Sequence, residues 1–211
     1  MNLKTAVKLR VLLTLAGLLV ALGGCSINPL GTGTPQTRFF VVSPLTVPEP
    51  PDGGLVKKDE IEIAIEQLVI PSYLDRPQIV IRTGDNELHI SEFNQWGENL
   101  RGNLSRVFLE NLALLMDSDN IFLVPSIKRQ SPDLRVAVRI IQFERGQSGA
   151  PHLTVRWTLY DREKKVIFRE NLVLTGENVG RYDYPAIVKA MSDLLADLSR
   201  RIVVIIRKHS I

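Results

Sequence analysis

Few residues of this 211-residue chain belong to types that commonly carry chemistry, and its single cysteine is the first of them. Cys25 is a potential nucleophile, because a thiolate attacks electrophilic centres. No two of the three histidines, His89, His152 and His209, have the i, i+4 spacing of a helical zinc site. The segment GQSGA at 146–150 lacks one spacer of the G-x-S-x-G nucleophile elbow. The pattern therefore predicts no catalytic residue and no metal site, although groups that converge from distant loops leave no such pattern.

The residues before Cys25 predict a secretory signal peptide. Residues 1–10 include three basic residues and no acid, and residues 11–22 are apolar apart from one threonine. This apolar run is shorter than the roughly 20 residues of a membrane-spanning helix and fits a signal peptide instead. The alternative is a buried, inert thiol. A thiol between an apolar run and a stretch rich in glycine and proline has no core around it.

The motif Leu22-Gly23-Gly24-Cys25 resembles the lipobox of bacterial lipoproteins. In that family the thiol receives a diacylglycerol, the chain is cleaved before the cysteine, and the new amine is acylated, with palmitate among the acyl groups. The resemblance implies that Cys25 carries a covalent lipid and that residues 1–24 are removed. No other cofactor is expected. Ser26 follows the cysteine where an inner-membrane retention signal has Asp, which implies the periplasmic face of the outer membrane.

Removal of the signal peptide also changes the charge of the protein. The chain has 26 basic and 23 acidic residues and a formal net charge of +3. Three of the basic residues and none of the acids lie before Cys25, so the remainder is formally neutral. This balance gives no reason to expect nucleic-acid binding. With its single cysteine lipidated, the domain contains no internal disulfide.

Composition divides the rest of the chain into a tether and one domain. Residues 25–37 contain the lipidated N-terminus and a segment rich in Gly, Pro, Ser and Thr, which predicts a flexible tether. Residues 38–211 have the length and apolar content of a single domain.

The first half of this domain alternates between apolar and polar residues, which is typical of strands. In residues 60–70 we expect Ile61, Ile63 and Ile65 to face inward from a half-buried strand that Pro71 ends. Further strands are expected at 38–42, at 78–82 and at 88–91, the last two forming a hairpin.

A second pattern, with apolar residues every three or four positions, predicts two helices. One apolar stripe extends from Trp96 to Leu115, and the other covers 184–208, with Asp183 as N-cap. The segment 202–206 is apolar all round, so it is either buried on more than one side or packed on another subunit.

Between the helices the pattern predicts a short buried strand at 121–125 and then an antiparallel meander. Its strands are 134–140, 153–160 and 166–174, with a bulge where Ile141 and Phe143 break the phase. The predicted fold class is α+β: one domain with a mixed, mostly antiparallel sheet and two long helices packed on one face.

The loop from Pro71 to Gln78 is the best candidate for a recognition site. Two prolines stiffen it, and it carries residue types common in interfaces. The candidate partner-binding residues are Tyr73, Leu74, Asp75, Arg76 and Pro77. The alternative is a structural turn in which Asp75 and Arg76 cap nearby backbone groups.

Taken in order, several segments resemble the auxiliary lipoproteins of ABC-type and MCE-type (mammalian-cell-entry) lipid transporters, the PqiC-type family. Besides the lipobox at Cys25, these segments are RFFVVSPL (38–45), IPSYLDRPQIVIR (70–82), LHISEFNQWGENL (88–100) and RVFLENLALLM (106–116). The resemblance covers about 38–208, and its C-terminal part matches only in pattern. It implies a non-enzymatic lipoprotein that docks an MCE-domain protein at the outer membrane, supports envelope integrity, and is able to form a homo-oligomeric ring.

Two other functions agree with the same residues. The protein could be a chaperone or plug for an outer-membrane barrel, or a shuttle that holds one acyl chain between sheet and helices.

Overall fold

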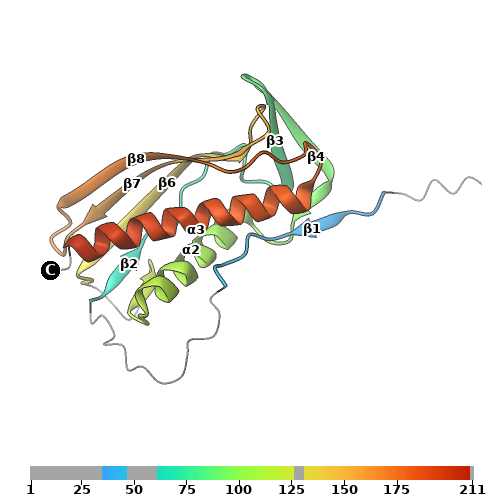
Figure 1. The fold of residues 1–211 in the computed structure, drawn as a ribbon. Coiled ribbons are helices and arrows are strands. Elements are labelled where there is room, and N and C mark those ends of the chain that lie inside the picture. Colours follow the sequence, from blue (N-terminus) through green and yellow to red (C-terminus); the bar gives the residue numbers. More distant parts are fainter. Residues whose placement is uncertain (1–34, 47–60, 126–130, 210–211) are drawn as a thin grey trace, which may run out of the picture. The chain divides into compact units, whose positions relative to one another are not determined.

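The computed structural model describes residues 35–46, 61–125 and 131–209. The chain divides into two compact units, 1–36 and 37–211. Cys25 and the predicted signal peptide therefore lie outside the described residues. Within the described part, the second unit contains an eight-stranded mixed sheet and two long helices (Figure 1). This confirms the predicted α+β class and the single domain.

The strands vary widely in length. They are β1 (Arg38–Phe40), β2 (Ile63–Ile65), β3 (Gln78–Gly84), β4 (Glu87–Trp96), β5 (Ile121–Leu123), β6 (Leu134–Arg145), β7 (Pro151–Tyr160) and β8 (Val166–Thr175). The meander of β6, β7 and β8 is confirmed, and so is the bulge, because the register of β6 against β7 shifts between Ile140 and Gln142.

Strand β6 is the centre of the sheet. Along one edge it pairs antiparallel with β7, which pairs with β8. Along the other edge, its first residues pair parallel with β2, which continues to β5, and its last residue lies opposite β3. Strand β3 forms an antiparallel hairpin with β4, and β1 pairs parallel with β4. The long pairings are thus antiparallel and the parallel ones are short.

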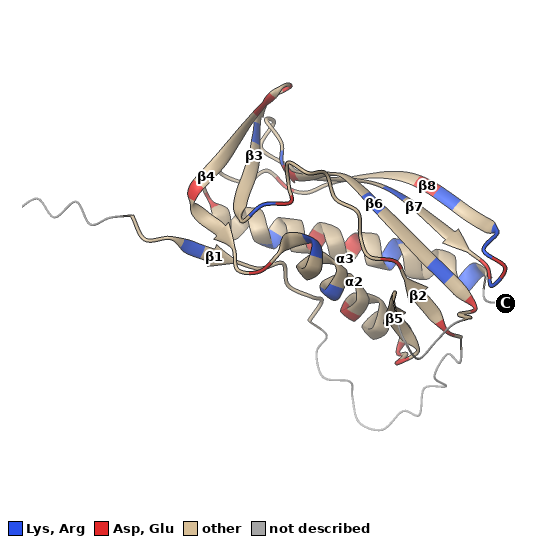
Figure 2. Cartoon of the chain, turned by 180° about the vertical axis from the view of Figure 1, so that it is seen from behind, with Lys and Arg blue, Asp and Glu red and all other residues tan. Residues whose placement is uncertain are grey.

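Both helices pack on the same face of the sheet, as Figure 1 shows from the front and Figure 2 from behind. Helix α2 (Leu100–Met116) begins after Asn99, whose side chain accepts a hydrogen bond from the Gly102 amide at 3.0 Å. Helix α3 (Tyr184–His209) begins after Asp183, which accepts one from the Ala186 amide at 3.2 Å. Asp183 is therefore the N-cap that the sequence predicts.

The core fills the layer between the sheet and the helices. Strand β7 directs alternate apolar residues into it, and α2 and α3 contribute the residues of their apolar stripes. The largest fully buried side chains include Trp157, Phe108 and Phe143. Of the apolar segment 202–206, all residues except Val204 are buried. This part of helix α3 is therefore buried on more than one side, and it offers no broad apolar surface to another subunit.

The strand prediction for 60–70 was wrong in extent and in burial. Strand β2 has three residues, and Ile63, Ala64 and Ile65 are all buried. Strand β2 lies between β5 and β6, so it is an inner strand rather than one with a solvated face. Beyond it the chain follows β6 less regularly: the Glu66 amide donates to the Val136 carbonyl at 2.9 Å, and Val69 forms an isolated bridge with Arg139.

The boundary between the predicted hairpin and the first helix was also wrong. Strand β4 continues to Trp96 instead of ending at residue 91, because Trp96 donates its amide to the Pro77 carbonyl at 2.6 Å and pairs with Phe40. Trp96 is buried, which explains why it matches the apolar period of the helix that follows.

Candidate functional site

The loop between β2 and β3 folds back on itself in successive turns. The amide of Leu74 donates to the Pro71 carbonyl at 3.0 Å, and the amide of Asp75 donates to the Ser72 carbonyl at 3.2 Å. The side chain of Leu74 is only 3% exposed and belongs to the core. Leu74 therefore anchors the loop, and a partner could reach it only after a rearrangement.

Asp75 joins the loop to the start of α2. One carboxylate oxygen is bound by the Arg101 guanidinium, and the other accepts a hydrogen bond from the Asn99 amide group at 3.2 Å. Asp75 thus binds side chains at a helix start and does not cap the nearby backbone. Asn99 also caps α2, so the loop and this helix are positioned by one set of contacts.

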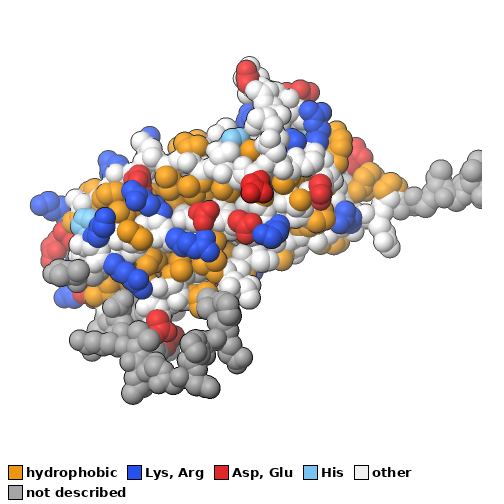
Figure 3. All heavy atoms as spheres, in the orientation of Figure 1, with side chains coloured by type: hydrophobic (Ala, Val, Ile, Leu, Met, Phe, Trp, Pro, Cys, Tyr) orange, Lys and Arg blue, Asp and Glu red, His pale blue; other side chains and the backbone are white. Residues whose placement is uncertain are grey.

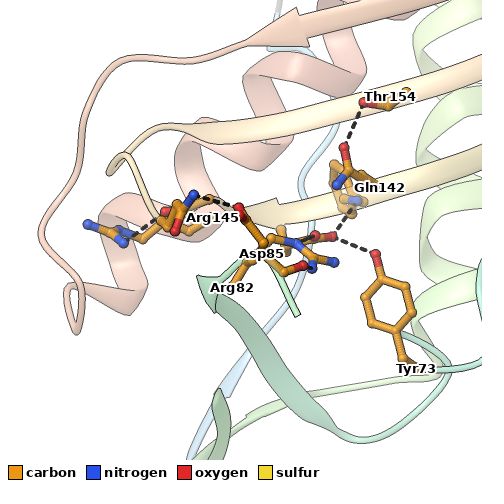
Figure 4. Close-up of polar contacts among 10 residues, drawn as sticks. Tyr73, Arg82, Asp85, Gln142, Arg145 and Thr154 are labelled. Atoms are coloured by element: carbon orange, nitrogen blue, oxygen red, sulfur yellow. Dashed lines mark hydrogen bonds and ion pairs between the residues drawn. The ribbon is translucent and has the colours of Figure 1, made fainter. Parts of the chain in front are cut away.

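Tyr73 belongs to a buried polar cluster around Glu144 (Figure 4). Glu144, on β6, is 2% exposed, and its carboxylate accepts three hydrogen bonds. The donors are the Tyr73 hydroxyl at 2.9 Å, the Arg82 Nε at 2.8 Å and the Phe143 amide at 2.9 Å. Burial raises the pKa of the Tyr73 phenol well above its ordinary value, and the negative charge of Glu144 adds to this shift. Because three donors satisfy the buried carboxylate, the role of this cluster is structural: it connects the loop and β3 to β6.

Further hydrogen bonds extend the Glu144 cluster to the two hairpin turns. Arg82 Nη1 donates to the Asp85 carbonyl at 3.1 Å, and Gln147 donates to the Asp85 carboxylate at 2.9 Å. Asp85 lies in the turn between β3 and β4, and Gln147 lies in the turn between β6 and β7. The two hairpins are therefore connected by side chains where their strands share little backbone pairing.

Arg145 follows this cluster and is also buried. Its Nε donates to the Val179 carbonyl at 2.9 Å and its Nη1 donates to the Gly146 carbonyl at 3.1 Å. Among the described residues no carboxylate forms an ion pair with it. Burial lowers the pKa of Arg145, and the nearby charge of Arg181 lowers it further. Its contacts hold the connection between β8 and α3.

A small hollow opens beside the loop. Its volume is about 280 Å³, and it is lined by Asp75, Arg76, Pro77, Trp96, Glu98 and Asn99. Three of these are predicted site residues. The acids of the hollow are already neutralised, since Asp75 is bound by Arg101 and Glu98 by Arg106 at 2.7 Å.

Arg76 is the cation of this hollow that lacks a counter-charge. No carboxylate of the described residues forms an ion pair with Arg76, and its Nε is buried without a hydrogen-bond partner. A guanidinium in this state is suited to bind a carboxylate or a phosphate from another molecule. The hollow can therefore recognise an anion, and Pro77 lies exposed at its rim.

The remaining candidates for chemistry have local explanations. His89 contacts the ring of Tyr182, His152 forms a hydrogen bond with Thr175, and His209 forms one with the Ile205 carbonyl. No three His, Cys, Asp or Glu side chains in the described part of the chain are placed to hold a metal ion. GQSGA forms the turn between β6 and β7. No helix in the described ranges is long and apolar enough to cross a membrane.

Sequence reasoning missed Arg82, Asn99, Arg101 and above all Glu144. The available signal was the bulge in β6, after which Phe143, Glu144 and Arg145 are buried in succession. A break in alternation that brings a charged residue inward indicates a buried ion pair, but it does not identify the partner.

Comparison with known proteins supports the fold and the family. No curated protein matches the sequence. Two solved structures share the fold. One is of an uncharacterized protein, with a TM-score of 0.64, 19% identity, and coverage of 81% of this chain and 99% of that one. The other is of protein XCC0632 from Xanthomonas campestris, of family DUF330, with a TM-score of 0.62, 14% identity, and coverage of 79% and 92%.

The family model that matches is described as the ABC-type transport auxiliary lipoprotein component, and it aligns with residues 44–203. This range is well over half of the chain and includes the loop, the hollow and the Glu144 cluster. The chain belongs to the family of ABC-type transport auxiliary lipoproteins.

Proposed function

We propose that this protein is a lipoprotein of the outer membrane, on its periplasmic face, and a non-enzymatic auxiliary component of an MCE/ABC-type intermembrane lipid transport system. In this role it would contribute to envelope integrity. The family match over residues 44–203 carries the proposal, because it assigns a transport auxiliary role. The lipobox supports the anchor, with a diacylglycerol on Cys25 as the attachment.

We further propose that the loop after β2 contacts the MCE-domain protein. Of the five candidate residues, Arg76 and Pro77 have the accessible surface for direct contact, whereas Leu74 is in the core. Tyr73 and Asp75 would act by holding the loop through Glu144 and Arg101. Arg76 would pair with a carboxylate of the partner, because the acids beside it are already bound.

Photo-crosslinking in cells tests this proposal, with the photoreactive residue at position 77 on the rim of the hollow. Position 173 on β8 is the matched control, because Val173 is also exposed and lies on another part of the domain. We expect adducts with an MCE-domain protein from position 77 and none from position 173. Arg76→Glu should greatly reduce the adducts, and Arg76→Lys should keep a large part of them.

Other adducts would support other functions. Adducts between copies of this chain would indicate a homo-oligomeric ring with the loop at its seam. Adducts with an outer-membrane barrel would favour the chaperone or plug. Lipid that co-purifies with the domain, in the absence of MCE adducts, would favour the shuttle.

A further inference from the structure

The ribbon formed by β1 and β4 has two different faces. Phe40 and Trp96 are paired in the register and face the core, where the Phe40 ring lies 6.3 Å from the Tyr184 ring. Because side chains alternate along a strand, Phe39 and Val41 point to the opposite face. Phe93 comes directly before Asn94, the partner of Arg38 in the register, and is exposed near the start of β1.

This outer face is apolar and exposed. Phe39 is 65% exposed, Val41 46% and Phe93 38%. Because Gly97 has no side chain, Val41 and Phe39 lie close to its backbone: a Cβ there would be 3.3 Å from Val41 Cγ1 and 3.9 Å from Phe39 Cβ. Figure 3 shows hydrophobic side chains at this end of the domain, where β1 lies. Phe39 and Val41 on one face, with Phe93 exposed near the start of β1, indicate a surface that another apolar phase covers.

The position of the ribbon in the chain indicates that a membrane covers this face. Arg38 is 13 positions after Cys25. A tether of the predicted composition has a mean end-to-end distance of about 20 Å at this length, so a lipid on Cys25 would keep β1 close to the bilayer. Arg38 is exposed, but by the same alternation it shares the face of Phe40, and its guanidinium lies 5.1 Å from the centre of the Phe40 ring, so it is not part of the outer face.

We propose that the outer face of the β1–β4 ribbon, with Phe39 and Val41 and the neighbouring Phe93, rests in the interface of the membrane that holds the Cys25 lipid. The inference depends on the lipid anchor of the proposed function. It adds a second, non-covalent contact that would orient the domain on the membrane and leave the hollow beside Arg76 free for a partner.

Site-specific labelling of the full-length lipidated protein tests this contact. The native chain has a single cysteine, whose sulfur is occupied by the lipid, so Phe39→Cys introduces one reactive thiol. Val173→Cys is the matched control, because Val173 is 64% exposed and Phe39 is 65% exposed. Each variant is labelled with an environment-sensitive fluorophore and reconstituted into phosphatidylethanolamine and phosphatidylglycerol vesicles that contain a nitroxide-labelled lipid.

We expect the fluorophore at position 39 to shift to shorter wavelength in vesicles and to be quenched severalfold more than the fluorophore at position 173. Equal, weak quenching at both positions would overturn the proposal. A blue shift at position 39 that depends on protein concentration and not on vesicles would also overturn it, because a second copy would then cover this face.

Mass spectrometry of the N-terminal peptide separates failure of this inference from failure of the anchor. An acylated Cys25 together with an unquenched position 39 would overturn the membrane contact alone. An unacylated Cys25 would overturn the proposed anchor and the membrane contact with it.

Discussion

Along its whole length β6 pairs with β7, but on its other edge the first part and the last residues are attached to their neighbours by different forces. The first part lies between β7 and β2, pairs with both through its backbone, and contributes apolar side chains to the core. At the other end, Arg145 lies opposite Ile81, and within the described residues this is the single register pair that the backbone of β6 forms with that of β3. There the β3–β4 hairpin is positioned by the buried Glu144 cluster.

In this domain apolar packing supplies stability, and the polar cluster sets geometry. Apolar burial in the β6–β8 meander is strong and not directional, so it supplies most of the stability. The polar cluster contributes less net free energy, but its hydrogen bonds have fixed directions. The cluster therefore sets the position of the hairpin and of the loop that carries Arg76.

The largest effect is expected in the meander. Trp157 is fully buried, and its ring centroid lies 5.1 Å from that of Phe168. Its indole Nε1 donates a hydrogen bond to the Glu170 carboxylate at 3.0 Å. Trp157→Ala should lower the free energy of unfolding by about 3–5 kcal/mol, measured by urea denaturation. Val173→Ala, an exposed change in the same meander, should alter it by less than about 0.5 kcal/mol. Similar losses for both variants would contradict the assignment of the core to the meander.

A smaller and more local effect is expected at Glu144. Glu144→Gln removes the negative charge beside Arg82, whose side chain is partly exposed, and should cost about 1–3 kcal/mol. Hydrogen exchange should accelerate in β3 and β4 more than in β7 and β8, because the hairpin loses its attachment. Uniform acceleration through the sheet would show that the cluster stabilises the whole domain instead.

Tyr73 should make the stability contributed by the Glu144 cluster sensitive to alkaline pH. Its phenol has a raised pKa in the folded protein, so the folded state holds this proton more tightly than the unfolded chain. The stabilisation is complete below the ordinary tyrosine pKa of about 10 and is lost as the pH rises above it. Tyr73→Phe should cost about 1–2 kcal/mol near pH 7, and its difference from the wild type should shrink by about pH 11. A constant difference in denaturation midpoints would contradict this origin.

Glu170 should give the meander a weaker sensitivity at acidic pH. Its hydrogen bonds with Arg201 and Trp157 lower the pKa of Glu170, so its stabilisation is present above the ordinary glutamate pKa and is lost as the pH falls. Glu170→Gln should cost about 0.5–1 kcal/mol near pH 7 and almost nothing near pH 3, because Arg201 is exposed and the pair is screened. Denaturation at the two pH values measures this difference.

The comparison of the two regions also explains which predictions were correct. The meander and helix α3 follow from local patterns: alternation over nine or ten residues, a bulge where the phase breaks, and an aspartate N-cap. The short parallel strand β2 was misjudged because its burial depends on β5 and β6, which are distant in the sequence. The residues of the loop were identified, but their contacts with Glu144 and Arg101 were not.

The α+β class, the meander, both helices and the loop as a candidate site were predictable from the sequence, because hydrophobic period and turn chemistry act over a few residues. Only the folded chain shows that Leu74 is an anchor, that no carboxylate in the described ranges pairs with Arg76, and that Phe39 and Val41 are exposed. These properties depend on which distant segments lie beside each residue. Burial and charge pairing are sums over neighbours in space, and a pattern along the chain does not contain them.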